Sequence, residues 1–196
     1  RSIYGISDEE VVSRDKITEI VEQGLLHIPT PFNIQANRAL VLYGEESDKF
    51  WDGLLDVMKE KLTEEQFPKT QKKLESFKAG YGTILYYIYQ PDMDKMKEDS
   101  PSYAHNFDSW ADQSSGMFQY FIWSALEAEG LGASLQHYNE LIEEWTKAKF
   151  NLPDGWVMRA QMPFGKPTEA AGDKEFKDLS DTLIVKSERK APTCGL

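Results

Sequence analysis

The sequence is poor in residues that cross-link small proteins or bind metals: it has one cysteine, Cys194, and three histidines. A single cysteine forms neither a disulfide within the chain nor a cysteine-rich zinc site. None of His27, His105 and His137 has a second histidine at metal-ligand spacing, so no metal site is expected. Long apolar runs are also missing, because no stretch approaches the roughly 20 apolar residues of a transmembrane helix.

Positive charge is scarce as well. Lys and Arg total 22 against 33 Asp and Glu, which gives a formal net charge of −11. Contacts to phosphate backbones need an excess of Lys and Arg, so nucleic acid is not an expected partner. The sequence opens without a secretory segment, which fits a cytoplasmic protein with no membrane partner. The acidic runs Asp8–Glu10 and Glu143–Glu144 are interpreted as solvated helix faces.

Common catalytic signatures are absent from the sequence. There is no Gly-x-Ser-x-Gly elbow, which argues against an α/β-hydrolase, and no phosphate-binding loop ending in Gly-Lys-Ser/Thr. The segment that starts Gly130-Leu131-Gly132 lacks the third glycine of a dinucleotide fingerprint and follows a helical pattern rather than a strand. These observations exclude the best-known nucleotide and hydrolase folds.

What the sequence does contain is enough apolar material for one folded domain. Hydrophobic residues make up 40% and aromatic residues 12% of 196 residues, without an internal repeat or a linker. We therefore expect a single domain over residues 1–186. The remaining residues, 187–196, include Cys194 and are expected to form a disordered tail.

The spacing of apolar residues predicts helices mixed with a few strands. Helices are expected over 14–27, 47–61, 69–79, 114–129 and 140–149, and strands over 39–43, 83–89, 156–162 and 182–186. Ser13 and Asn139 are expected to cap the starts of helices and Ser47 to open one, Gly130 to end one in a left-handed conformation, and Pro163 and Gly165 to stop a strand. The mixed order indicates an α+β or α/β sandwich, and the strands are too few for a doubly wound sheet.

Two of these segments are unusually apolar. Residues 83–89 are apolar or aromatic on both faces, which is typical of a strand in the middle of a sheet. The helix over 114–129 has almost no polar stripe, so it should be buried nearly all round. Such a helix is most easily buried between two layers or at a subunit interface.

Several further segments carry a resemblance by their order and spacing: Arg1–Tyr4, Pro29–Gln35, Gly130–Asn139, Met162–Pro167 and Lys174–Lys177. Together they resemble the FMN-dependent nitroreductase family, and more closely its branch of fungal fatty-acid-repression and bacterial copper-induced nitroreductases. The likeness extends over nearly the whole chain. The runs Gln-His-Tyr-Asn and Pro-Phe-Gly-Lys-Pro within these segments are typical of that branch.

The resemblance implies a fold and an activity. The fold would be a three-layer α+β sandwich, with a central, mostly antiparallel sheet flanked by helices, in an intertwined homodimer. The cofactor would be FMN, and hydride would pass from NAD(P)H through flavin N5 to a flat nitroaromatic or quinone acceptor. One alternative is a flavin-binding regulatory or stress-response protein with incidental reductase activity. Another is a plain interaction domain whose motifs match by coincidence.

The resemblance also implies a set of binding residues. Those assigned to the cofactor are Arg1, Ser2, Tyr4, Thr30, Pro31, Phe32, Asn33, Gln35, Ser114, Gln136, His137, Tyr138, Lys174 and Lys177. Charged and hydroxyl donors at Arg1 and Ser2 suit a phosphate, and Lys174, Lys177 and Lys166 are further candidates for the same group. Such local positive charge is needed on a chain of net charge −11, although exposed lysines are also simply solvated.

The remaining assignments concern the flavin ring. The amides of Asn33 and Gln35 both donate and accept, which matches the ring's pyrimidine edge, and in the family this segment reaches a flavin held mainly by the other subunit. The backbone N–H groups of His137 and Tyr138 are expected next to N5 as the catalytic donors. The His137 side chain is either a general acid or a group that packs against or caps the next helix.

Two features set this sequence apart from the common nitroreductase pattern. Tyr4 stands where most members have a second basic residue, so charge near the N1–C2 edge of the ring is weaker or comes from elsewhere. The chain begins with Arg1 rather than methionine, whereas the family usually has an arginine directly before this position. If the chain is truncated, that arginine and its helix precede it.

Four aromatic residues are candidates either for the wall of a substrate pocket or for the core: Phe32, Tyr103, Phe107 and Trp110.

Overall fold

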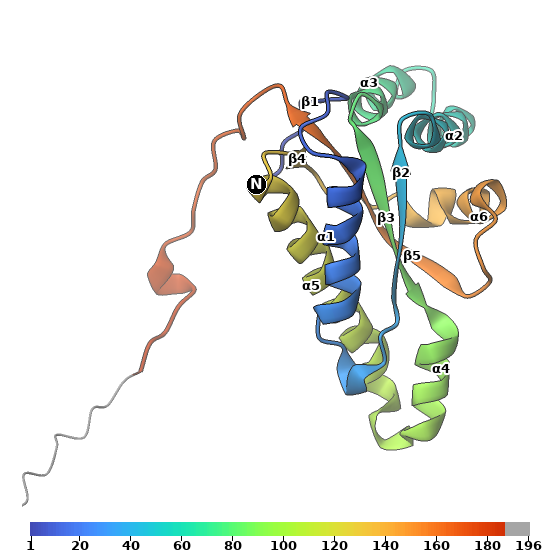
Figure 1. The fold of residues 1–196 in the computed structure, drawn as a ribbon, viewed down its shortest axis with the longest axis vertical. Coiled ribbons are helices and arrows are strands. Elements are labelled where there is room, and N and C mark those ends of the chain that lie inside the picture. The colour runs from blue at the N-terminus through green and yellow to red at the C-terminus, as the bar shows by residue number, and fades with distance from the viewer. Residues whose placement is uncertain (187–196) are drawn as a thin grey trace, which may run out of the picture.

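A computed structural model describes residues 1–186 (Figure 1). The expected tail, with Cys194, lies outside the described residues. The helices are α1 (Arg14–His27), α2 (Glu45–Lys61), α3 (Phe67–Lys78), α4 (Gln90–Asp99), α5 (Phe107–Ala128) and α6 (Asn139–Phe150). The strands are β1 (Ile6–Ser7), β2 (Asn37–Tyr43), β3 (Gly82–Tyr89), β4 (Gly132–Ala133) and β5 (Trp156–Pro167). Short 3₁₀ turns cover Pro31–Asn33 (η1), Pro101–Asn106 (η2) and Leu179–Asp181 (η3).

The strands form one antiparallel sheet in the order β1-β5-β3-β2, and β4 also pairs with β5. β3 lies between two long neighbours, and every residue from Gly82 to Ile88 is buried. A strand that is covered on both faces needs apolar residues at successive positions, which is the pattern of this segment. The expectation of an α+β fold with a mostly antiparallel sheet is confirmed.

Helices cover both faces of the sheet, so the fold has three layers (Figure 1). On one face α1 and α5 pack against Ile84 and Tyr86 of β3, and on the other α2, α3 and α6 pack against Leu85 and Tyr87. This division follows from the strand geometry, because successive side chains point to opposite faces. Burying each such large side chain contributes about 1.5–3 kcal/mol. α4 and η2 lie together beyond one end of the sheet (Figure 1).

Helix α5 corrects the expectation of a helix buried nearly all round. It begins at Phe107, seven residues before the expected start, and it leaves Met117 43% and Tyr120 72% exposed. The reason is geometric: the sheet and α1 cover part of the helix surface, and nothing within residues 1–186 covers Met117 and Tyr120. The helix ends as expected before Gly130, whose φ is +87°.

The roles expected of Ser47 and Asn139 at the starts of helices are also wrong. α2 begins at Glu45 after Gly44, and Ser47 is buried inside the helix, where its hydroxyl lies 2.8 Å from the Thr83 hydroxyl of β3. α6 begins at Asn139 itself rather than after it, and the Asn139 side chain is used in contacts with β5. In both cases a polar side chain that is able to cap a helix makes a tertiary hydrogen bond instead. Ser13, in contrast, caps α1 as expected, because its hydroxyl accepts from the Lys16 N–H.

The C-terminal strands differ from expectation as well. β5 continues through Pro163 and Gly165 to Pro167, so neither residue stops it. At Gly165 a Cβ atom would lie 2.3 Å from the Ser7 carbonyl oxygen, so glycine lets β1 pair closely there. The strand expected over 182–186 is absent, since these residues have no regular structure. The periodicity also missed α4, whose one buried residue is Met93, and the two-residue strands β1 and β4.

The acidic runs are not both solvated helix faces. Residues 8–10 precede α1 in a loop, where Glu10 accepts a hydrogen bond from Tyr81 and Glu9 from Lys166. Glu143 is partly buried, and its carboxylate accepts from the Met158 N–H at 2.7 Å. Glu144 alone fits the expectation, with 87% of its side chain exposed. Among residues 1–186, no helix has both the length and the apolar character needed to cross a membrane.

Candidate flavin site

A cavity of about 720 Å³ lies where the N-terminal segment and the segment directly after β5 meet the C-terminal end of α5. Four of the expected cofactor residues line it: Arg1, Ser2, Tyr4 and Lys174. The rest of the wall comes from α5 (Tyr120, Trp123, Ser124, Glu127) and from the segment after β5 (Glu169, Ala170, Gly172, Asp173). The fold thus brings together residues that are separated by about the whole length of the sequence.

Hydrogen bonds hold the N-terminal segment in this position. The Ile3 N–H donates to the Ala133 carbonyl of β4 at 3.0 Å, and the Gly5 N–H donates to the Glu169 carboxylate at 2.9 Å. The backbone nitrogen of Arg1 lies 3.1 Å from Glu127 Oε1. These contacts place Arg1 and Ser2 beside the end of α5 and next to the start of the segment after β4.

The cations of the cavity have the chemistry that a phosphate needs. The Arg1 guanidinium donates to the Gly172 carbonyl, and the Lys174 ammonium lies 5.5 Å from the centre of the Phe176 ring. Within residues 1–186, neither side chain is paired with a carboxylate. Their charges are therefore not neutralised and fit a dianionic group. Glu127, Glu169 and Asp173 lie in the same wall, and their negative charges oppose the binding of an anion.

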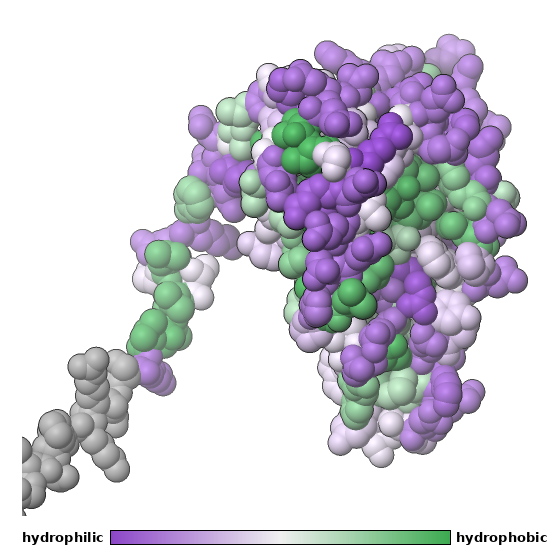
Figure 2. All heavy atoms as spheres, viewed as in Figure 1, coloured by the Kyte–Doolittle hydropathy of each residue, from purple (hydrophilic) through white to green (hydrophobic). Residues whose placement is uncertain are grey.

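The other candidate lysines lie elsewhere. Lys177 is exposed on the segment that leaves the body after β5, and it does not line the cavity of its own chain. Lys166 is paired with Glu9. Figure 2 shows apolar side chains on this departing segment, where Phe176 is 80% and Ile184 82% exposed.

Residues 134–138 continue the same edge of the sheet along β5. The Ser134 N–H donates to the Pro163 carbonyl at 3.3 Å, and Gln136 and Gln161 exchange two backbone hydrogen bonds at 2.7 and 2.9 Å. At about 3.3 Å per extended residue, His137 lies about 13 Å from Ala133, the residue that holds Ile3. One edge of one chain therefore carries both Arg1–Ser2 and the segment expected to face the flavin ring.

The two expected backbone donors differ in this structure. The Tyr138 N–H donates to the side-chain Oε1 of Gln161 at 2.7 Å. The His137 N–H makes no hydrogen bond with residues 1–186, and His137 is exposed. Gln136, also an expected site residue, is buried, and its amide donates to the Ser134 hydroxyl at 3.2 Å. The backbone N–H of His137 is therefore available to a ligand, whereas the backbone N–H of Tyr138 is already hydrogen-bonded to Gln161.

The proline segment that was expected at the ring edge lies far from this cavity. Phe32, Asn33 and Gln35 all have positive φ angles, of 52°, 56° and 53°, although none is glycine. The Thr30 hydroxyl accepts from the Gln35 N–H at 3.0 Å and closes the turn around Pro31. Three such residues in four positions store backbone strain, and strain of this kind is concentrated at binding sites.

The length of α5 separates the segment from the cavity. The Phe32 ring packs at 5.8 Å from Phe107, at the start of α5, while Arg1 contacts Glu127, at its end. Twenty residues of helix span about 30 Å, which is longer than an FMN molecule. One chain therefore does not bring residues 30–35 and Arg1 to the same flavin. Ser114, within α5, is buried, and its hydroxyl donates to the Ala111 carbonyl at 2.9 Å.

The four aromatic candidates form one cluster at the start of α5. The Phe32 ring lies 6.0 Å from Tyr103 and 6.2 Å from Trp110, besides its contact with Phe107. Phe107 is fully buried and belongs to the core, whereas Phe32 is 60% and Tyr103 50% exposed. The cluster thus has a buried base and an exposed rim that offers flat surfaces to a ring-shaped molecule.

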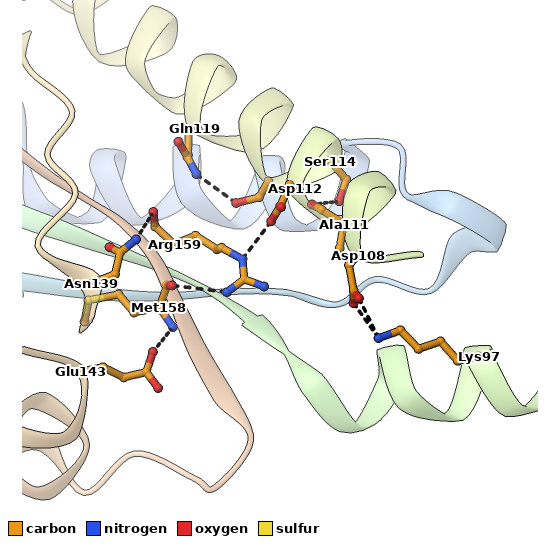
Figure 3. A network of polar contacts seen from close by, with 11 residues as sticks. Lys97, Asp108, Ala111, Asp112, Ser114, Gln119, Asn139, Glu143, Met158 and Arg159 are labelled. Atoms are coloured by element: carbon orange, nitrogen blue, oxygen red, sulfur yellow. Dashed lines mark hydrogen bonds and ion pairs between the residues drawn. The ribbon is translucent and has the colours of Figure 1, made fainter. Parts of the chain in front are cut away.

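Sequence reasoning missed a polar network that joins α5, β5 and α6 near His137 (Figure 3). The Arg159 guanidinium donates to Asp112 of α5 at 2.9 Å, and the Asn139 amide of α6 donates to the Arg159 carbonyl at 2.9 Å. No local spacing predicts these pairs, because the partners lie 20 or more positions apart. Gln161 had a weak signal: it is a polar residue within an apolar strand segment.

An antiparallel sheet between two helical layers, with a cation-lined cavity at the edge of β5, is the architecture of flavin-dependent oxidoreductases of the nitroreductase fold. The nitroreductase family model matches residues 1–166. Among curated proteins, HBN1 of Saccharomyces cerevisiae is 36% identical over 180 residues, covering 90% of this chain and 88% of that protein. Nitroreductase FRM2 of the same yeast is 31% identical, with the same coverage of both.

Solved structures agree. Nitroreductase CinD from Lactococcus lactis, in complex with chloramphenicol, matches with a TM-score of 0.87 at 37% identity over 95% of both chains. The FMN complex of a protein from Exiguobacterium sibiricum shares the fold at 15% identity, with a TM-score of 0.68 over 95% of this chain and 93% of that one. The chain belongs to the nitroreductase family, whose members carry out flavin-dependent oxidoreduction.

Proposed function

We propose that this protein binds FMN and uses NAD(P)H to reduce nitroaromatic or quinone acceptors. One observation carries the proposal: the cavity at Arg1 and Lys174 and the open N–H of His137 lie along one edge of the sheet. A phosphate and a ring are the two ends of FMN, and this edge offers a partner to each. The family and the size of the cavity support the same cofactor.

Different residues of this chain would bind the phosphate and the ring of FMN. Arg1, Ser2 and Lys174 would hold the phosphate through charge-assisted hydrogen bonds. The His137 N–H would donate to the ring edge at N5, where a fixed backbone donor needs no reorganisation as charge develops. When bound, FMN supplies the redox chemistry, taking a hydride from NAD(P)H and giving it to the acceptor. The protein supplies position, hydrogen bonds and a wall against water.

We further propose a homodimer with two equivalent sites. Residues 30–35 do not reach the cavity of their own chain, so a second copy is the source of that segment at each flavin. The exposed Met117 and Tyr120 of α5 form an apolar strip that a second copy would cover. The exposed Phe176 and Ile184 after β5 would extend the same contact. One domain over residues 1–186 and a cytoplasmic location stay predictions.

The acceptor class is supported by the relatives. The CinD structures include complexes with chloramphenicol and 4-nitrophenol, both of which carry a nitrophenyl ring. In this chain the exposed rings of Phe32 and Tyr103 would form a wall against which such a ring stacks, once a second copy brings them to the flavin.

The visible spectrum of the purified protein tests the proposal directly. We expect a yellow protein, or one that turns yellow with added FMN, that oxidises NADPH or NADH when a nitroarene or a quinone is supplied. A colourless protein that rejects FMN contradicts the proposal. Tight FMN binding with very slow reduction by either nicotinamide would favour the alternative of a flavin-binding regulatory or stress-response protein.

A further inference from the structure

Gln161 is a polar side chain in the centre of β5 with no exposed surface. Its Oε1 accepts from the Tyr138 N–H at 2.7 Å, and its Nε2 donates to Asn139 Oδ1 at 2.6 Å. A buried amide on an apolar strand is costly unless it is hydrogen-bonded, and here both ends of the amide are satisfied. Both partners belong to the segment that leads into α6, beside the candidate flavin site.

The orientation of this amide is determined by its neighbours. Asn139 donates through its own amide nitrogen to the Arg159 carbonyl at 2.9 Å, so its oxygen is directed at Gln161 (Figure 3 shows the bond to Arg159). Gln161 must then present its nitrogen to Asn139 and its oxygen to Tyr138. Three hydrogen bonds therefore link the Arg159 carbonyl, Asn139, Gln161 and the Tyr138 N–H, and each has only one possible donor and acceptor.

The neighbouring N–H groups differ in their partners. The Gln136 N–H donates to the Gln161 carbonyl, and the Tyr138 N–H donates to the Gln161 side chain, so residue 161 engages both. The N–H of His137, between the two, has no hydrogen-bond partner among residues 1–186, and His137 is exposed.

We propose that Gln161 is a positioning residue that, by binding the N–H of Tyr138, leaves the N–H of His137 as the single backbone donor to the flavin. This inference rests on the proposed function and narrows the expected pair of donors to one. Gln161 does not touch the flavin. It holds residues 136–138 in the one register that directs the His137 hydrogen outward.

Amide hydrogen exchange of the wild-type protein, read at single residues by NMR, is the first test. In the FMN-free protein the Tyr138 amide should exchange slowly and the His137 amide fast. Added FMN should slow the exchange of His137 at least tenfold and leave that of Tyr138 unchanged. A Tyr138 amide that exchanges fast in the free protein and is protected by FMN would overturn the inference.

Substitutions test the role of the Gln161 oxygen. Gln161→Met has a similar length but no strong acceptor, whereas Gln161→Glu keeps an oxygen for the Tyr138 N–H. For Gln161→Met we expect at least tenfold faster exchange at Tyr138. The kcat of the reductase should fall about 10²-fold, since small misplacements of reacting groups cost that much, while KM for NADPH stays within about threefold. Gln161→Glu should restore both the protection and most of kcat.

A matched control removes another buried polar side chain of the same region. Thr146 is fully buried in α6, and its hydroxyl donates to the Ile142 carbonyl. Thr146→Val should leave the exchange of Tyr138 and kcat unchanged. Equal losses in Gln161→Met and Thr146→Val would show a merely structural role for Gln161. If Gln161→Glu does not fold, exchange in the wild-type protein still decides the inference.

The inference and the proposed function fail in different ways. A wild-type protein that binds no FMN contradicts the proposed function, and the inference falls with it. A protein that binds FMN and is reduced by NADPH, but whose His137 amide gains no protection, leaves the proposed function standing. That result overturns the role assigned to Gln161 and His137 alone.

Discussion

Ile3 and Ala133 are joined by a backbone hydrogen bond of 3.0 Å, and this bond ties the N-terminal segment to the edge of the sheet. It connects the two halves of the candidate site, because Arg1 and Ser2 precede Ile3 while Gln136 and His137 follow Ala133. Gly132 lies beneath the contact, where a Cβ atom would sit 3.0 Å from the Cβ of Ile3. The site thus depends on a close approach that a larger residue would obstruct.

The first prediction concerns this approach. Gly132→Val should displace the N-terminal segment and weaken FMN binding by at least tenfold, since its branched side chain needs the space that Ile3 occupies. Fluorescence titration with FMN measures the effect. Gly172, in the cavity wall, has open space around it, so Gly172→Ala is the matched glycine control and should change FMN affinity little. Unchanged affinity in Gly132→Val would show that the Ile3 contact does not support the site.

The second prediction separates the lysines of the C-terminal segment. Arg1→Ala and Lys174→Ala each remove a proposed charged partner of the phosphate and should weaken FMN retention by about 1.5–3 kcal/mol, or about 10-fold to 150-fold. Lys177→Ala should cost less, because Lys177 does not line the cavity of its own chain. Lys59→Ala, an exposed lysine of α2, is the control for loss of charge alone. Equal effects of Lys174→Ala and Lys59→Ala would remove Lys174 from the site.

The third prediction addresses the homodimer. Met117→Glu places a charge in the exposed strip of α5, outside the cavity wall, and should convert the dimer into monomers, because an unpaired charge in an apolar contact is costly. Light scattering during size-exclusion chromatography measures the mass. Lys59→Gln changes the net charge by the same amount on α2, across the sheet from α5, and should leave the dimer intact. A wild-type protein of about 22.5 kDa in solution would contradict the proposed assembly.

Loss of the dimer should also lower activity. Residues 30–35 would no longer reach the flavin held by the other copy, so the Met117→Glu protein, whose substitution lies outside the cavity wall, should retain the phosphate contacts but lose the ring-edge contacts. We expect weaker FMN binding and a reductase activity at least tenfold lower. Full activity in a monomeric variant would indicate that residues 30–35 serve another purpose.

The fourth prediction concerns two polar residues of the core of β3. Thr83 accepts the indole N–H of Trp51 at 2.8 Å and bonds the Ser47 hydroxyl, so Thr83→Val leaves buried donors unpaired and should lower the free energy of unfolding by about 1–3 kcal/mol. The Tyr87 hydroxyl is buried with no partner among the described residues, and burial raises the pKa of this phenol far above its ordinary value.

Removal of the Tyr87 hydroxyl should therefore cost little. Tyr87→Phe keeps the ring against Trp156 and removes an unsatisfied polar group, so its stability should equal or exceed that of the wild type. Urea denaturation of both variants at pH 7 measures the difference. A loss of more than about 2 kcal/mol in Tyr87→Phe would indicate that the hydroxyl has a partner in solution.

Much of the fold could be predicted from local pattern. The start and end of α1, the central place of β3 and the left-handed end of α5 at Gly130 all follow from the chemistry of neighbouring residues. The assignments of Ser47 as the first residue of a helix and of Asn139 as a helix cap were wrong because their side chains bond to distant strands. Local pattern does not distinguish a residue that caps a helix from one whose side chain hydrogen-bonds to another element of the fold.

The candidate site also has features that follow from the sequence and features that only the tertiary structure shows. The sequence by itself determined which segments resemble a flavin site and which charged residues, Arg1 and the lysines at 166, 174 and 177, are candidates for the phosphate, since residue type fixes charge. Only the tertiary structure decided that Arg1 and Lys174 share a cavity, that residues 30–35 lie about a helix length away, and that Gln161 engages Tyr138. Such choices depend on distances between residues far apart in sequence, which backbone pairing and packing set together.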